Sequence, residues 1–299
     1  MFLKKLKKST IIALTGLMLV SSLGNLSFAD EKSNELNSKS TLSSFDIESK
    51  EEQSFSETRN EYDMVKELRN MGNQKLKTLG YDDNQIKELK NYETNFKKHI
   101  EEMSLLSDTE LKNLDYSEEQ INIIKNFNGS ESQIEKAAAS ITNTISKNSS
   151  SSTASKSKLN VKIRFSWSGV PVMQFTDAYA IVNGEGMYYD NENTLFTTTY
   201  TGSGGQKTYK GYLKRAGAGN TGADTKFPVY RNEVVKYYLK SGSANIGMSK
   251  SSRVKQCGIG VSYGHSSISL GITVTYPASL GISFGSKVTP TYKSNVFTL

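Results

Sequence analysis

The chain has 299 residues but only one cysteine, Cys257, and two histidines, His99 and His265. A single cysteine cannot form an intramolecular disulfide, so the burial of apolar side chains must stabilise the fold. Cys257 shares strand parity with Ile259 and Val261, which predicts a buried thiol that packs as a small apolar group. Metal sites built from His and Cys, and Ser/His/Asp or Cys/His catalytic sites, lack the residues they need.

The few side chains that could perform acid–base chemistry lie in sequence that is typical of solvated helices and turns. His99 falls on a charged helical stretch, where a solvated side chain is expected, and His265 falls in a turn sequence between two strands. Carboxylates are scarce after residue 158, and most stand in turn sequence typical of solvated loops: Asp177, Glu185, Asp190, Glu192, Asp224 and Glu233. A glycosidase pair is defined by separation in space, which the sequence does not give. We expect no enzyme activity, no catalytic residue, no metal and no cofactor.

Long apolar runs are also missing after the first 29 residues, so no membrane helix is expected there. The first residues carry four lysines, followed by an apolar run over 11–20 and the small-x-small pattern of Ser27, Phe28 and Ala29. This pattern predicts a secretory signal peptide that is cleaved after Ala29. We therefore expect a secreted, extracellular bacterial protein.

The scarcity of acidic residues in the second half makes the charge asymmetric. Residues 30–157 carry 17 basic and 24 acidic groups, whereas residues 158–299 carry 16 basic and 6 acidic groups. Opposite charges on tethered halves favour intramolecular docking, and a basic face favours anionic partners such as a membrane or a cell-wall polymer. Solubility alone is the other explanation of these charges.

Five segments follow from composition and periodicity. We predict a signal peptide over 1–29, a disordered acidic segment over 30–58, a helical domain over 59–146, a Ser-rich linker over 147–158 and a basic β-rich domain over 159–299. The corresponding fold class is α+β in two separate domains. The first would be a small helical bundle and the second an all-β antiparallel sandwich or barrel.

The helical segment contains an internal repeat. Residues 76–92 align with residues 111–127 at an offset of 35 residues, and eight of the 17 positions are identical. This period suits a helix hairpin, and the shared Leu, Tyr and Ile positions are typical of packing residues. Capping-box spacing predicts three helix starts, at Ser107, Ser117 and Ser130, and a last helix over 131–146.

The period changes from helical to two after the linker. Alternation over residues 159–167 predicts a half-buried strand, and further β-favouring runs cover 175–182, 186–189, 194–201, 207–214, 254–264, 267–276, 280–285 and 291–299. Residues 229–239 fit a strand or a helix. The G-x-G-x-x-G over 217–222 lies in this β-rich run and not in a βαβ unit, so it predicts a flexible turn. Dispersed basic residues on an exported chain give no reason to expect nucleic-acid binding.

The stretch from Cys257 to Gly285 has an unusual pattern, with an apolar face opposite a face of Gly, Ser and Thr and almost no charge. The same pattern fits a half-buried hairpin of a sandwich or a membrane barrel with lipid on its apolar face. The candidate membrane-active hairpin comprises Ile259, Val261, Tyr263, Ile268, Leu270, Ile272, Val274 and Tyr276.

Three functions remain compatible with these features. The first is a secreted, non-enzymatic, membrane-active protein, bacteriocin-like or pore-forming, whose basic β domain acts at anionic envelope surfaces and is masked by the acidic helical half. The second is a cell-wall or polysaccharide binding module without lytic activity, because 12 of the 16 tyrosines follow the linker and aromatic rings stack on sugars. The third is a structural β component with a helical pro-segment.

Overall fold

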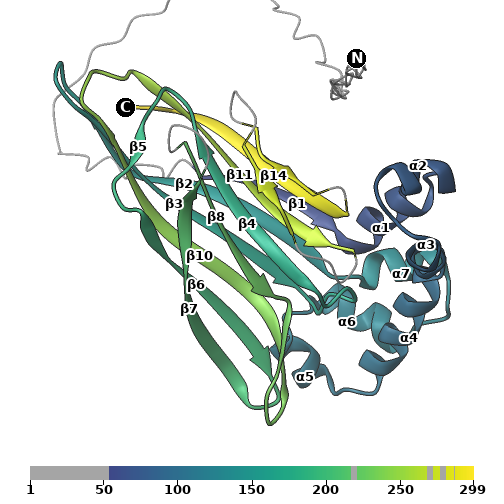
Figure 1. Cartoon of the computed structure of the whole chain (residues 1–299). Helices are drawn as coiled ribbons and strands as arrows, with labels where there is room; N and C mark the ends of the chain where they lie inside the picture. Colours follow the sequence, from purple (N-terminus) through teal and green to yellow (C-terminus); the bar gives the residue numbers. More distant parts are fainter. Residues whose placement is uncertain (1–53, 217–220, 268–271, 277–280, 286) are drawn as a thin grey trace, which may run out of the picture. The chain divides into compact units, whose positions relative to one another are not determined.

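The computed structural model describes residues 54–216, 221–267, 272–276, 281–285 and 287–299. The predicted signal peptide and most of the predicted disordered segment lie outside these residues. Residues from 50 onward form one compact unit, so the helices and the strands are not separated into two domains as expected. The described chain is mostly β, with seven helices that lie together at one end of the long strands (Figure 1).

The helices precede all but one of the long strands. They are α1 (Glu61–Arg69), α2 (Asn73–Thr78), α3 (Asp83–Lys90), α4 (Tyr92–Ser104), α5 (Asp108–Asn113), α6 (Glu118–Lys125) and α7 (Glu131–Ala137). α5 and α6 begin and end 35 residues after α2 and α3, so the two copies of the repeat have the same helices. In each copy a lysine donates to carbonyl oxygens at the end of the helix that comes before the copy: Lys90 at the end of α1 and Lys125 at the end of α4.

Local capping explains most of the helix starts. The Ser107 and Ser117 capping boxes form as predicted, whereas Ser130 makes no side-chain cap hydrogen bond. A further box, between Asp82 and Gln85, was not predicted. The last helix ends at Ala137 rather than 146, because the following residues pair as a strand.

The described strands form one 12-stranded antiparallel sheet and a separate two-stranded sheet. The main path runs β1-β2-β3-β10-β6-β7-β8-β4-β11-β14, with β5 and β9 paired to β10. The bounds are β1 (Ser54–Asn60), β2 (Ser140–Ser152), β3 (Ser157–Ser168), β4 (Thr176–Asn183), β5 (Tyr188–Tyr189), β6 (Asn193–Gly202), β7 (Gly205–Ala216), β8 (Gly222–Pro228), β9 (Tyr230–Asn232), β10 (Lys236–Lys250), β11 (Gln256–Ser266), β12 (Val274–Thr275), β13 (Ser283–Phe284) and β14 (Val288–Thr298).

The main sheet is barrel-like and nearly closed, because its two ends approach each other. The buried Asn143 amide of β2 donates to the carbonyl oxygen of Thr291 on β14, at 3.0 Å. Arg59 of β1 donates to the carbonyl oxygen of Pro290 on β14, at 2.8 Å. Side chains therefore bridge the place where the sheet would close.

Two apolar cores hold the unit together. The larger core lies inside the sheet, where the rings of Phe165, Tyr179, Phe196, Phe227 and Tyr263 pack on one another. The smaller core lies among the helices and includes side chains from the β3–β4 connection. This connection packs the helices against the sheet.

The predicted linker and the end of the predicted disordered segment are strands instead. β2 pairs with β1 on one side and with β3 on the other, so residues 140–168 form a hairpin whose turn is closed between Thr153 and Lys156. The reason is that Ile141 and Ile145 are fully buried on the inner face of β2, while serines and threonines occupy its outer face. A serine-rich segment forms a strand when every second side chain is buried in the core.

Two further expectations can be decided. Residues 229–239 form β9, a short loop and the start of β10, not a helix. Cys257 is buried, as predicted, and burial raises the pKa of its thiol to about 11.

Candidate functional site

A long uncharged stretch contains the candidate site. The sequence has no Lys, Arg, Asp or Glu between Lys255 and Lys287. β11 occupies the first part of this stretch, and the chain then leaves the main sheet and returns at β14. We name residues 267–287 the excursion. Its described residues include the two short strands β12 and β13, which pair with each other.

The six predicted hairpin residues that the structure describes fall on two segments, β11 and the excursion, which do not pair with each other. Ile259, Val261 and Tyr263 lie on β11 and are fully buried in the sheet core. Ile272 is buried, while Val274 and Tyr276 are half-buried on the excursion. The remaining two, Ile268 and Leu270, lie outside the described residues.

The predicted strand over 267–276 is reduced, in its described residues, to β12. β11 pairs with β4 and β14 and not with this segment. The physical reason is that β4 and β14 are long partners whose inner faces share the core with β11, whereas Tyr276 and Phe284 of the excursion pack on the outer face of the sheet.

The outer face beneath the excursion carries very small side chains. Ladder partners on β8, β4 and β11 place these residues side by side, and we name them the small-residue face: Ala178, Ala180, Val182, Gly222, Gly260, Ser262 and Gly264. All seven are buried, although they point away from the main core. Burial on both faces of β4 and β11 requires a cover, and the described excursion residues supply part of it.

Two aromatic rings of the excursion use the space that the glycines leave. Tyr276 lies against Gly222, and its hydroxyl donates to Asp224 at 3.0 Å. Phe284 lies against Gly264, where an added Cβ would come within 2.8 Å of the ring. The observed packing of the Tyr276 and Phe284 rings on the sheet therefore requires glycine at positions 222 and 264.

Replacing Gly222 with valine is expected to lower the free energy of unfolding by about 1–3 kcal/mol, because the new side chain overlaps the Tyr276 ring. Gly211→Val is the matched control, since the nearest atom to a Cβ on that strand glycine is 3.9 Å away. It is expected to change stability by less than about 0.5 kcal/mol. Urea unfolding of both variants measures the difference, and equal effects would contradict this packing.

The two ends of the excursion meet at a neck that the helices hold. Ser267 donates to the Lys287 carbonyl oxygen through its backbone N–H, at 3.2 Å, and its hydroxyl, at 2.9 Å. Tyr81 shares a 2.8 Å hydrogen bond with the Ser267 hydroxyl, and Tyr92 donates to the Ser267 carbonyl oxygen at 3.0 Å. Lys287 donates to the Gln85 side chain at 3.1 Å. The helical layer thus binds both strands of the neck.

A buried ionic cluster lies directly beside the neck. The His265 ring places Nδ1 2.7 Å from Asp177 of β4 and Nε2 3.1 Å from Glu61 of α1. All three side chains are fully buried. Glu61 also accepts hydrogen bonds from the backbone N–H groups of Val172 and Met173, each at 2.8 Å. The cluster joins the first helix to the end of β11.

The cluster corrects one expectation from the sequence. His265 is not a turn residue, because β11 continues through it, whereas Asp177 lies within the predicted strand over 175–182, which is β4. Burial disfavours the charged ring, but the charges and hydrogen bonds of Asp177 and Glu61 outweigh it and raise the pKa of His265 to about 10. The imidazolium is therefore the form that balances two buried carboxylates at neutral pH.

None of the three side chains of this cluster is exposed to solvent, and together they connect α1, β4 and β11. The described residues contain no group of three or more His, Cys, Asp and Glu side chains suited to a metal ion. Over the same residues, no helix is long and apolar enough to cross a membrane.

His99 also differs from expectation. It is half-buried rather than solvated, and its Nε2 lies 3.1 Å from the Tyr116 hydroxyl. Burial lowers its pKa, so the neutral ring is favoured. Tyr116 is the counterpart of Tyr81 in the repeat, and the two tyrosines bind different partners.

The apolar pattern changes phase where the excursion begins. On β11 the apolar side chains occupy odd positions and face the core, whereas on the excursion they occupy even positions, as at Ile272 and Ile282. The β11–β14 ladder ends with the pair Ser266 and Val288. Continuing its register by six residues would pair Ile272 with Ile282 and would place every apolar side chain of the excursion on the outer face.

In the structure, the excursion does not follow this continued register. Val274 pairs with Phe284 in the structure, whereas the continued ladder would place residue 280 opposite Val274. The excursion sequence is therefore compatible with two strand pairings that keep its apolar side chains on one face. One is the observed β12–β13 pairing, and the other continues the β11–β14 ladder.

No protein-family model matches this chain, and no curated protein matches it. Solved structures that it resembles weakly include the Clostridium perfringens delta-toxin, with 7% identity and a TM-score of 0.23 over 55% of this chain and 86% of that chain. A structure titled "Pore forming protein" has 9% identity and a TM-score of 0.19 over 54% and 79% of the two chains. The Clostridium perfringens NetB toxin in the membrane inserted form has 8% identity and a TM-score of 0.17 over 54% and 84%. Likeness at this level carries no weight for the function, which must rest on this chain's own geometry.

Proposed function

We propose that this chain is a secreted, non-enzymatic, pore-forming protein whose excursion leaves the small-residue face and enters a membrane as a β-hairpin. The observation that carries the proposal is the change of phase at the end of the β11–β14 ladder. A hairpin that continues this ladder has apolar side chains on the outside and Gly, Ser and Thr on the inside. This is the arrangement that a strand needs between lipid and a water-filled lumen.

The length and charge of the excursion fit this role. The continued register leaves a three-residue turn over 276–278 and nine residues for each strand, which at about 3.3 Å per residue gives a strand of about 30 Å. Spanning strands have about 9–11 residues. The stretch carries no ionisable Lys, Arg, Asp or Glu side chain that would have to enter the lipid.

In this proposal the folded unit shields the apolar side chains of the hairpin from water until the hairpin inserts into the membrane. The small-residue face covers part of its apolar stripe, and Tyr81, Tyr92 and Gln85 of the helical layer bind its neck. Masking by the helical half is therefore local in this proposal, at the neck. Release requires these three hydrogen-bonding contacts to break.

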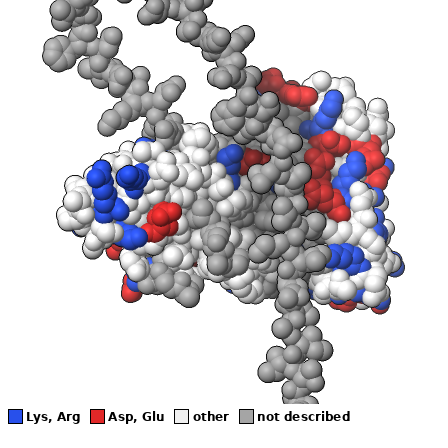
Figure 2. All heavy atoms as spheres, turned by 90° about the horizontal axis from the view of Figure 1, so that it is seen from above, with Lys and Arg blue, Asp and Glu red and all other residues white. Residues whose placement is uncertain are grey.

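Basic strands would attract the unit to an anionic surface. The outer positions of β3 and β7 carry Lys158, Lys162, Arg164, Lys210 and Lys214, and neither strand has an acidic residue. The acidic side chains visible in Figure 2 gather mainly over the helical end, away from most of the described sheet surface in that view. Long-range attraction of this kind raises the rate of encounter and weakens with salt.

A dye-release assay tests the proposal. The secreted chain without residues 1–29 is added to calcein-loaded vesicles of phosphatidylglycerol and phosphatidylcholine, and to vesicles of phosphatidylcholine alone. We expect leakage from the anionic vesicles that weakens with added salt. Absence of leakage from both would overturn the proposal.

A wall-binding function without lysis is the second candidate, and one surface feature favours it. Tyr212 is 54% exposed on β7, opposite the exposed Leu195, with Lys210 and Lys214 on the same face. An exposed aromatic ring between lysines suits an anionic wall polymer. Retention on purified peptidoglycan with attached anionic polymer, without any vesicle leakage, would support this function in place of pore formation.

A further inference from the structure

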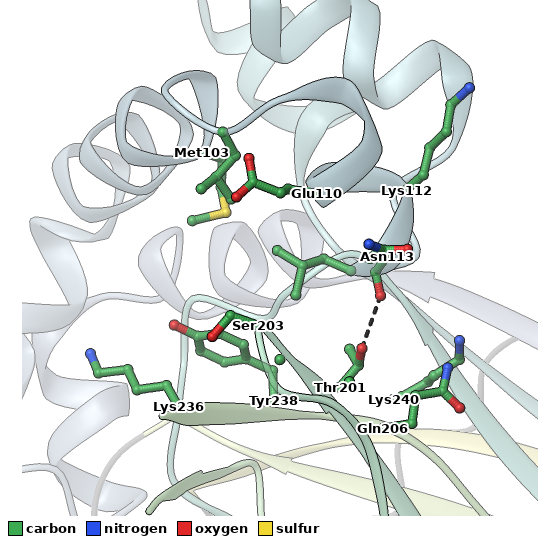
Figure 3. Close-up of a pocket in the computed structure, with 14 residues that line it drawn as sticks. Met103, Glu110, Lys112, Asn113, Thr201, Ser203, Gln206, Lys236, Tyr238 and Lys240 are labelled. Carbon is green, nitrogen blue, oxygen red and sulfur yellow. Dashed lines mark hydrogen bonds between the residues drawn. The ribbon is translucent and has the colours of Figure 1, made fainter. Parts of the chain in front are cut away.

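A cavity of about 600 Å³ lies between the helices and the sheet, away from the excursion. Its walls come from the α4–α5 region, the turn between β6 and β7, and the start of β10 (Figure 3). The Thr201 hydroxyl donates to the Asn113 carbonyl oxygen at 2.9 Å and fixes the two walls together at one side. This volume falls in the range of small-molecule sites, which are about 300–1,000 Å³.

The side chains at this cavity have unused hydrogen-bonding capacity. Tyr238 is half-buried in the middle of the view in Figure 3, between Lys236 and Thr201. Its hydroxyl makes no hydrogen bond to any described residue. The side chains of Asn113 and Gln206 are exposed and bond to no described residue, so their amides are open to a ligand. An aromatic ring and two amides that line the same cavity are groups that can bind the ring and the hydroxyl groups of a sugar.

Of the cations that line the cavity, only Lys236 lacks an ionic partner among the described residues. The Glu110 carboxylate accepts hydrogen bonds from the backbone N–H and the hydroxyl of Ser107, both at 2.7 Å. Asp115 is paired with Lys240 at 2.7 Å. The Lys236 side chain is exposed, and its ammonium has no ion pair or hydrogen bond to any residue that the structure describes. A bound carboxylate or phosphate would pair with this ammonium.

We infer that this cavity binds a sugar that carries an acidic group, with the ring on Tyr238, the acidic group at Lys236 and the hydroxyls at the two amides. This inference goes beyond pore formation and does not depend on it. It assigns the chain a recognition site for anionic glycan at the junction of helices and sheet. Carboxylated and phosphorylated sugars share the chemistry, and the two have to be distinguished by binding.

Calorimetric titration of the secreted chain, without vesicles, tests the site. The probes are a glucuronate-containing disaccharide, glucose 6-phosphate and neutral lactose, each up to about 10 mM. We expect saturable binding of at least one acidic probe that is about tenfold tighter than that of lactose. The stronger acidic probe identifies the carboxylated or the phosphorylated class.

Lys236→Gln is expected to weaken the acidic probe about tenfold while leaving lactose unchanged, and Tyr238→Leu is expected to weaken all probes. Lys136→Gln, which removes an exposed lysine on α7 away from the cavity, is the matched control and should bind like the parent chain. Absence of binding to every probe would overturn the inference, as would equal affinity of the parent chain and Lys236→Gln for the acidic sugar. Because no membrane is present, neither result affects the leakage assay.

Discussion

Ile282→Lys is expected to abolish vesicle leakage, while Ser283→Lys, one residue further along, is expected to preserve it. In the proposed hairpin Ile282 faces lipid and Ser283 faces the lumen, because the two positions alternate across the strand. A lysine that faces lipid near the middle of a bilayer costs about 2–4 kcal/mol, and every copy of the chain in a pore would bear this cost. A lysine in the lumen should instead shift the conductance toward anions.

The two variants form a matched pair, because Ile282 is half-buried and Ser283 is exposed in the stowed form, and both receive the same charge. Calcein release and planar-bilayer conductance supply the readouts, and thermal unfolding shows whether each variant remains folded. Equal leakage by parent chain and Ile282→Lys would show that this strand does not face lipid. Loss of leakage in both variants, with intact folding, would contradict the assigned faces.

His265→Gln is expected to lower the free energy of unfolding by about 3–5 kcal/mol, because it leaves the Glu61 and Asp177 carboxylates buried without their cation. Lys112→Met is the matched control, since it also removes a cation from an ion pair, but the pair with Glu118 is exposed. Exposed pairs contribute at most about 1 kcal/mol. Urea unfolding at pH 7 measures both. Equal effects would show that the buried cluster does not stabilise the fold.

The same histidine predicts how stability depends on pH. Its folded pKa, about 10, lies above the ordinary value of 6.5, so the folded state binds the proton more tightly than the unfolded state. Its stabilising contribution is complete below about pH 6.5 and is lost as the pH rises toward 10, with a limiting slope of about 1.4 kcal/mol per pH unit. The parent chain should lose stability over this window more steeply than His265→Gln. Parallel profiles would contradict a charged His265.

The helices were the most predictable part of the fold because their signals are local. The 35-residue repeat and the Ser107 and Ser117 capping boxes depend on residues within one or two turns of each other, and the structure contains them. The period of two likewise predicted the inner and outer faces of β3 and β11.

The serine-rich strands and the ionic cluster were not predictable in the same way. β2 is a strand because β1 and β3 lie beside it, and its composition alone resembles a linker. His265 is 88 residues from Asp177 and 204 residues from Glu61, so only the fold brings them together. One signal was present in the sequence: Asp177 and His265 each continue the inward-facing positions of an apolar strand, where a charged group needs a partner.

Each chain contributes only the two strands of its excursion to the proposed pore. A two-stranded ribbon leaves unpaired backbone groups along both edges, which lipid does not tolerate, and the smallest bacterial membrane barrels contain about eight strands. At least about four molecules must therefore assemble before any opening exists. The rate of release should rise with roughly the fourth power of protein concentration at low dose. Dilution should then lower the leakage far more steeply than it lowers the protein concentration itself.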